Sequence, residues 1–179
     1  MRTALCISGE LRSYRETYFQ LKKNIINQLK PDIFIYSWDS IGGSWKSRAN
    51  DNKYNKFFVD HFHNAPRGKQ LKNDLQTLFS PRSMILETFK ENYKNTINNI
   101  SRPVELLLDP NKNRWSQYNL PMFYTMYHCN QLKIKAELED KREYDLVIKM
   151  RTDIKFPKIP ENILKKKTVL WYYPKDHNE

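Results

Sequence analysis

The sequence is poor in the residues that bring disulfides and common nucleotide-binding loops into a fold. Only two of its 179 residues are cysteine and only four are glycine. Cys6 and Cys129 lie too far apart for a disulfide framework, which predicts reduced thiols and a cytoplasmic protein. The glycines form no G-x-G-x-x-G pattern and no P-loop, which disfavours dinucleotide binding and P-loop hydrolysis.

Long hydrophobic runs are also missing. No window reaches the roughly 18 apolar residues of a membrane span, so we expect no transmembrane segment, although peripheral membrane contact stays open. The apolar run at the N-terminus is too short for a signal peptide.

Positive charge is in excess. The 31 lysines and arginines outnumber 20 acidic residues, for a formal net charge of +11 and a pI near 9.6. This surplus suits a polyanion such as nucleic acid, a membrane surface or a phosphorylated substrate. The lysines are scattered, however, and compositional drift is the simpler explanation for most of them. The charge by itself identifies no partner.

Residues 3–38 predict a strand, a helix and a second strand. Thr3–Ile7 is an apolar run without alternation, as in a strand buried on both faces of a parallel sheet. Ser13 and Glu16 have capping-box spacing, so a helix begins there and ends at Pro31. Asp32–Trp38 completes a βαβ unit. The helix has four residues at helical spacing: Tyr18, Leu21, Ile25 and Leu29.

The rest of the chain continues this alternation less regularly. Further helices are predicted at Asp51–His63, Lys69–Phe79 and Pro121–Lys141. Further strands are predicted at Ser83–Phe89, Tyr144–Met150 and Thr168–Tyr173, and residues 91–114 form a loop with one short helix. We therefore expect one α/β domain over residues 1–179, with a Rossmann-like, mostly parallel sheet sandwiched by helices.

Polar residues follow three of the predicted strands. They are Ser8 to Arg12, Ser37 to Asp39, and Arg151 to Asp153. Ligands of open α/β sheets bind beyond the carboxyl ends of the strands. If the strands are parallel, these segments meet at one rim.

The first two segments suit a nucleotide. Ser8 and Gly9 would let backbone amides approach an anion or a base; the alternative is an ordinary turn with Arg12 on the surface. Trp38 and Asp39 could stack on and hydrogen-bond a nucleoside, or be a strand-end aromatic and a turn residue.

The last segment suits a phosphate. Lys149 interrupts an apolar strand and needs a partner or a shifted pKa, unless it extends to the sheet edge. Arg151 and Asp153 project from the same side, where arginine can bind phosphate and aspartate can bind Mg²⁺. An internal ion pair between them is the alternative.

Other candidates are weaker. Tyr124 and Tyr127 lie beside an apolar helix stripe and are predicted to belong to the core. Neither Cys6 nor Cys129 has an activating group nearby in the sequence.

The strand motifs together resemble a glycosyltransferase-like group found in polysaccharide gene clusters and large viruses, with a GT-A fold. The resemblance rests on residues 5–12, 31–38 and 144–153, and on the helical segment 122–133. Residues 40–118 match poorly, apart from the strand at Ser83–Phe89, and are a candidate mobile region.

The resemblance implies a sugar transfer from a nucleoside-diphosphate donor to a glycan or lipid-linked acceptor. Ser8, Gly9 and Arg12 would line the nucleotide pocket, with Trp38 and Asp39 near the nucleoside. Arg151, Thr152 and Asp153 would occupy the place of the D-x-D motif.

In that motif Asp153 matches the direct ligand of Mn²⁺ or Mg²⁺. Arg151 departs from the first carboxylate and could itself neutralise the diphosphate, assisted by Lys149. The resemblance identifies no catalytic base, and the length predicts a donor-binding half of a transferase. The alternative is a non-catalytic nucleotide- or nucleic-acid-binding module; nucleic acid is the less favoured partner.

Overall fold

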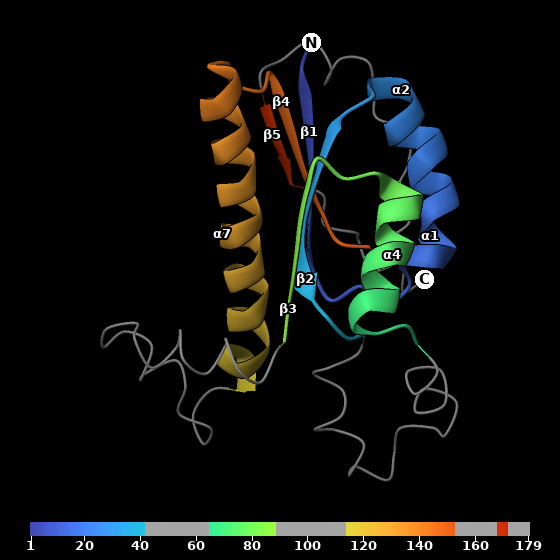
Figure 1. The fold of residues 1–179 in the computed structure, drawn as a ribbon. Helices are drawn as coiled ribbons and strands as arrows, with labels where there is room; N and C mark the ends of the chain where they lie inside the picture. Colours follow the sequence, from blue (N-terminus) through green and yellow to red (C-terminus); the bar gives the residue numbers. More distant parts are fainter. Residues whose placement is uncertain (42–64, 89–113, 153–167, 172–179) are drawn as a thin grey trace, which may run out of the picture.

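The computed structural model describes residues 1–41, 65–88, 114–152 and 168–171 (Figure 1). These residues contain a five-stranded parallel sheet in the order β3-β2-β1-β4-β5. The strands are β1 (Thr3–Gly9), β2 (Asp32–Trp38), β3 (Ser83–Glu87), β4 (Leu146–Met150) and β5 (Thr168–Trp171). The helical elements are α1 (Tyr14–Leu21), the π-helical turn η1 (Lys22–Ile26), α2 (Asn27–Leu29), α4 (Gly68–Phe79) and α7 (Arg114–Asp140). The predicted α/β class with a parallel sheet is confirmed.

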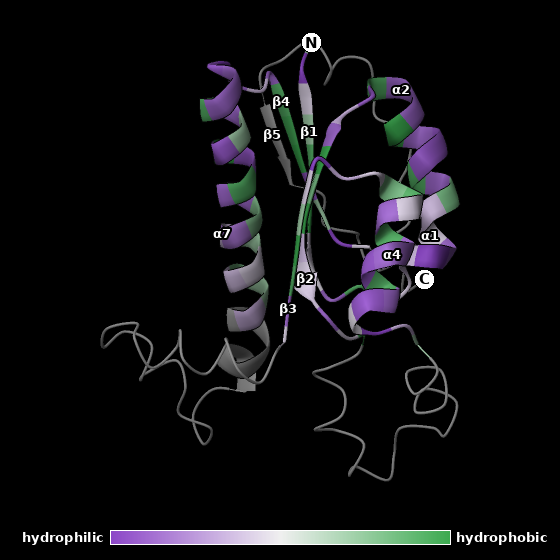
Figure 2. Ribbon diagram, viewed as in Figure 1, coloured by the Kyte–Doolittle hydropathy of each residue, from purple (hydrophilic) through white to green (hydrophobic). Residues whose placement is uncertain are grey.

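Helices cover both faces of this sheet. The segments from α1 to α2 and the helix α4 lie on one face, and α7 runs along the other (Figure 1). Figure 2 shows the outer side of α7 as mainly hydrophilic and its sheet-facing side as more hydrophobic. The sheet therefore has one core on each face.

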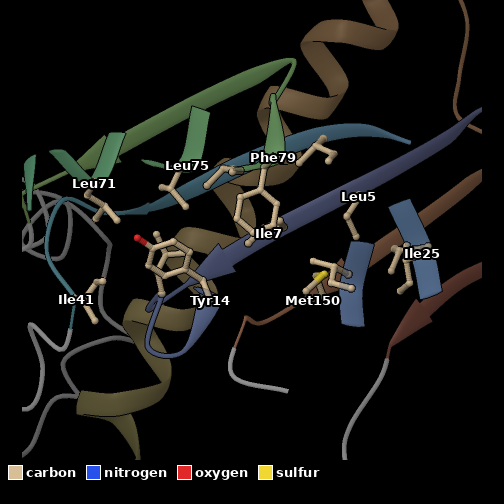
Figure 3. Packing of buried hydrophobic residues seen from close by; sticks show 14 of the residues in the cluster. Leu5, Ile7, Tyr14, Ile25, Ile41, Leu71, Leu75, Phe79 and Met150 are labelled. Atoms are coloured by element: carbon tan, nitrogen blue, oxygen red, sulfur yellow. The ribbon is translucent and has the colours of Figure 1, made fainter. Parts of the chain in front are cut away.

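The larger core lies between the sheet and the α1 and α4 side. Ile7 of β1 packs there with Tyr14, Leu71, Leu75 and Phe79 (Figure 3). Every residue of β1 is buried, as its unalternating apolar run predicts for a central strand.

The smaller core lies under α7. It is formed by Ala4, Cys6, Phe34, Tyr36, Cys129, Ala136 and Tyr144. In β4 the even-numbered residues 146, 148 and 150 join the larger core, whereas Val147 packs against the smaller one. This is the alternation expected of a strand between two layers.

The first helix begins and ends where predicted, but the capping box does not form. Ser13 is the N-cap residue, yet its side chain makes no capping hydrogen bond. Its carbonyl accepts a hydrogen bond from the Thr17 hydroxyl at 3.0 Å. At the other end Lys30, with φ of 44°, terminates the helix directly before Pro31.

The predicted start of the long helix at Pro121 is wrong. The helix α7 begins at Arg114 and contains Pro121 in its interior. Proline is common in a first helical turn, which is why the sequence pattern pointed to it. The buried Thr125 hydroxyl donates to the Pro121 carbonyl at 3.1 Å. Tyr127 is also not a core residue, because it is 61% exposed, whereas Tyr124 packs against the smaller core.

Two predicted segments lie outside the described residues. They are the helix at Asp51–His63 and the loop with one short helix at Glu91–Arg114, of which only Arg114, the first residue of α7, is described. Within residues 40–118 the structure does describe α4 and β3, which join the sheet and the larger core.

The amino ends of the strands are joined by a charged network. Arg82 binds both carboxylate oxygens of Asp140, at 2.6 and 2.8 Å, and reaches Asp32 at 3.0 Å. Arg2 pairs with the same Asp140, and its guanidinium lies 4.0 Å from the Tyr144 ring centroid. These contacts connect the end of α7 to β1, β2 and β4, opposite the carboxyl rim.

Candidate functional site

The carboxyl ends of the strands converge on one rim, as predicted. In the sheet β2 and β3 lie on one side of β1, whereas β4 and β5 lie on its other side. The strand order therefore reverses between β1 and β4. In α/β sheets a crevice opens beyond the strand ends at such a point. The register pairs Gly9 with Ser37 and Ile7 with Met150. Arg151 therefore follows β4 close to the end of β1.

Gly9 leaves space at this rim where a side chain would otherwise lie. Its φ is +92°, a conformation that side chains disfavour, and a Cβ built there would meet nothing within 4 Å. The Ser37 hydroxyl, which is buried, donates to the Gly9 carbonyl at 2.6 Å. Ser8 and Gly9 are the last two residues of β1 and both are buried, so neither of these two predicted residues is exposed at the rim.

Hydrogen bonds join β4 to the loop after β1. The Thr152 hydroxyl donates to the Glu10 carbonyl at 3.4 Å, and the Thr17 hydroxyl of α1 donates to the Thr152 carbonyl. Thr152 is only 2% exposed. Thr152, the middle residue of the predicted triplet Arg151 to Asp153, is thus held by hydrogen bonds to the loop after β1 and to α1. Arg151 lies beside it at the surface.

Arg12 is paired at the rim. Its Nε donates to Glu10 Oε2 at 2.9 Å, and Glu10 is the more buried partner. The two charges offset each other, so Arg12 adds less positive potential to the rim than the sequence suggests. Glu10 was not among the predicted site residues because nothing in its position distinguished it from a loop carboxylate.

Trp38 is covered by another ring. It is 2% exposed and stacks on Tyr124 of α7, with centroids 5.8 Å apart and planes at 8°. Trp38 therefore matches the second reading given for it, a strand-end aromatic residue, since a nucleobase could stack on that face only by displacing Tyr124. Trp38 thus contributes to the site by positioning its neighbours.

Asp39 is held rigidly beyond Trp38. Its carboxylate accepts a hydrogen bond from the Thr88 hydroxyl at 2.7 Å. Its amide donates to the Glu87 carbonyl at 2.8 Å, and its carbonyl accepts from the Gly68 amide at 2.7 Å. The ends of β2 and β3 and the start of α4 thus define where this carboxylate lies.

An aromatic cluster with one carboxylate lies under α7 at the same end. The hydroxyls of Tyr36 and Tyr124 donate to different oxygens of Glu87. His128 stacks on Tyr36, with centroids 4.9 Å apart. Burial, and then the bond to Glu87, raises the pKa of Tyr36, so its hydroxyl stays protonated. Glu87 was overlooked because the predicted strand continued to Phe89, which placed Glu87 inside it, whereas β3 ends at Glu87.

Lys149 and Arg151 occupy different environments. Lys149 is half-buried in β4, where it is the register partner of Cys6. Arg151, just after the strand, is exposed. Asp153 lies outside the described residues. Among the described residues there is no group of three His, Cys, Asp or Glu side chains that could hold a metal ion.

Comparisons with protein-family models, curated proteins and solved structures found no match in any of the three. In the part of the chain that the structure describes, no helix is long and apolar enough to cross a membrane.

Proposed function

We propose that the chain binds a nucleoside-diphosphate sugar at the crevice between β1 and β4 and serves as a GT-A-like glycosyltransferase domain. The observation that carries the proposal is the open space beside the Cα of Gly9, located where the strand order reverses. A parallel α/β sheet offers its ligand site at this point. The resemblance of the three strand-end segments to the transferase group supplies the donor class.

Diphosphate is the part of the donor that these residues suit best. Arg151 is exposed beside the end of β1, and a guanidinium can bind two phosphate oxygens at once. The absence of a side chain at Gly9 leaves space close by, into which a phosphate could fit. Asp39, fixed by Thr88, is available for the ribose or base. Under the proposal Asp153 would hold Mn²⁺ or Mg²⁺, which would neutralise further diphosphate charge.

The acceptor in this proposal is a glycan or a lipid-linked glycan. A cytoplasmic location, with contact to a membrane surface where a lipid-linked acceptor would lie, is part of the same proposal. Nucleic acid is not the proposed partner, because the rim contains a paired Arg12–Glu10 and an acidic Asp39 rather than a basic stripe.

Calorimetry with UDP-, GDP- and TDP-sugars, with and without Mn²⁺, tests the proposal. We expect one donor to bind, and Arg151→Ala to weaken it about 10-fold, because a charge-assisted hydrogen bond at an exposed position contributes roughly 1–2 kcal/mol. Arg142→Ala is the matched control, since it removes the same charge from an exposed side chain at the opposite end of the sheet.

The outcomes separate the alternatives. Binding that Arg151→Ala weakens and Arg142→Ala leaves unchanged supports a site at the rim. Equal effects of the two variants would indicate that only bulk charge matters. Donor binding without sugar transfer would favour the non-catalytic nucleotide-binding alternative. No binding of any nucleotide or nucleotide sugar would refute the proposal.

A further inference from the structure

The only two cysteines of the chain are neighbours in the fold. Cys6 lies in β1 and Cys129 in α7, and both belong to the smaller core. Their side chains are 2% and 1% exposed. Residues separated by most of the described chain are thus brought to the same place by the packing of α7 on the sheet.

The helix approaches the sheet closely at this position. The Cys129 sulfur lies 3.5 Å from the carbonyl oxygens of Ile7 in β1 and Phe34 in β2. Phe34 is the register partner of Cys6, so the sulfur of Cys129 is located over the strand pair that contains Cys6. The Cys129 thiol has one proton, so it donates to one of these two carbonyl oxygens at a time. Small residues at Ala4 and Ala136 in the same core are compatible with this approach.

The surroundings distinguish the two thiols. The neighbouring Cys129 thiol lowers the pKa of Cys6, and the ammonium groups of Lys149 and Lys133 act in the same direction against burial. The nearby Cys6, together with burial, raises the pKa of Cys129. Lys149 is the direct register partner of Cys6 on β4. One cysteine is therefore suited to attack and the other to resolve.

We propose that Cys6 and Cys129 form an oxidisable dithiol, which a peroxide converts into a disulfide that joins α7 to β1. The Cys6 thiolate attacks hydrogen peroxide, so that an S–O bond forms, the O–O bond breaks and hydroxide leaves to become water. The sulfur of Cys129, having lost its proton, then attacks the sulfenic sulfur. The S–S bond forms, the S–O bond breaks and a second water leaves. The two thiols supply the two electrons that reduce the peroxide.

The site is separate from the proposed donor site. Cys6 and Cys129 lie within the core under α7, whereas Gly9 and Arg151 lie at the carboxyl rim. Oxidation would fix α7, which also contains Tyr124, against the strands that end at that rim. Because the buried sulfurs admit only a small oxidant, hydrogen peroxide should react faster than the bulky oxidised glutathione.

The test is oxidation of the reduced full chain by a small excess of hydrogen peroxide. After denaturation, alkylation should count two free thiols per chain before treatment and none after it, with both restored by dithiothreitol. Peptide mass spectrometry should find the Cys6 peptide linked to the Cys129 peptide. The oxidised chain should show a Tm higher by roughly 5–15 °C, because the bond closes a loop of about 120 residues.

Variants separate this chemistry from accidental oxidation. Cys129→Ser should form no intramolecular disulfide, and oxygen should add to Cys6 instead. Lys149→Met should slow disulfide formation severalfold, and Lys149→Arg should restore most of the rate. If the folded chain gains oxygen atoms on its cysteines without linking them, the proposal is overturned. It is also overturned if the disulfide forms no faster in the folded chain than in denaturant.

Discussion

Replacement of Gly9 by alanine is the sharpest test of the rim backbone. The φ of +92° lies beyond the ordinary left-handed region near +57°, where a non-glycine residue already costs roughly 1–2 kcal/mol. The added Cβ would meet no atom within 4 Å, so steric overlap contributes nothing. We therefore expect Gly9→Ala to lower the free energy of unfolding by about 1–3 kcal/mol through backbone strain alone.

Gly68→Ala is the matched control for this variant. Gly68 has φ of +50° and equally open surroundings, so alanine there should cost only about 1 kcal/mol. Urea unfolding of both variants, with m-values that match the parent, measures the difference. If Gly9→Ala unfolds within about 0.5 kcal/mol of the parent, the positive φ at the rim is wrong. In the absence of urea, where the Gly9→Ala variant is folded, its affinity for the donor should also fall, because the new methyl group occupies the space beside the backbone at the rim.

Two further predictions concern the packing and the opposite end of the sheet. Leu75→Ala, in the larger core and fully buried, should cost about 2–5 kcal/mol in urea unfolding, whereas exposed Gln76→Ala on the same helix should change stability by less than about 0.5 kcal/mol. The hydrogen bonds from Arg82 lower the pKa of Asp140 below 3.8, so the stability from this pair is complete above that pH and is lost as the pH falls through the lowered pKa. Arg82→Met should therefore destabilise the chain at about pH 7, with a gap to the parent that narrows towards about pH 3; a gap that stays constant would contradict the pairing.

Much of the fold was predictable because its signals are local. The unalternating run in β1 and the alternation in β4 each follow from which faces of a strand are buried, and neighbouring residues record that directly. The limits of α7 were less predictable, because proline marks a helix start only on average. The capping-box spacing was also an unreliable local signal: Ser13 is the N-cap residue, but its ψ of 36° lies outside the extended region typical of a capping residue.

The site was predictable as a set of strand ends and not as a set of contacts. Parallel strands bring Gly9, Asp39 and Arg151 to one rim whatever the details of packing. The pairing of Arg12 with Glu10 and the burial of Trp38 under Tyr124 depend on loop conformation and on a helix far along the chain. No periodicity in the sequence records such partners.

The sequence by itself determined the α/β class, the five strands of the described sheet and the polar residues at their carboxyl ends, because apolar spacing and strand direction are local properties. Only the tertiary structure decided the strand order, and with it the reversal of that order between β1 and β4. It also decided that α7 crosses the sheet so that Cys129 meets Cys6 and Tyr124 covers Trp38. These contacts join residues distant in the chain, and their geometry exists only once both cores have packed.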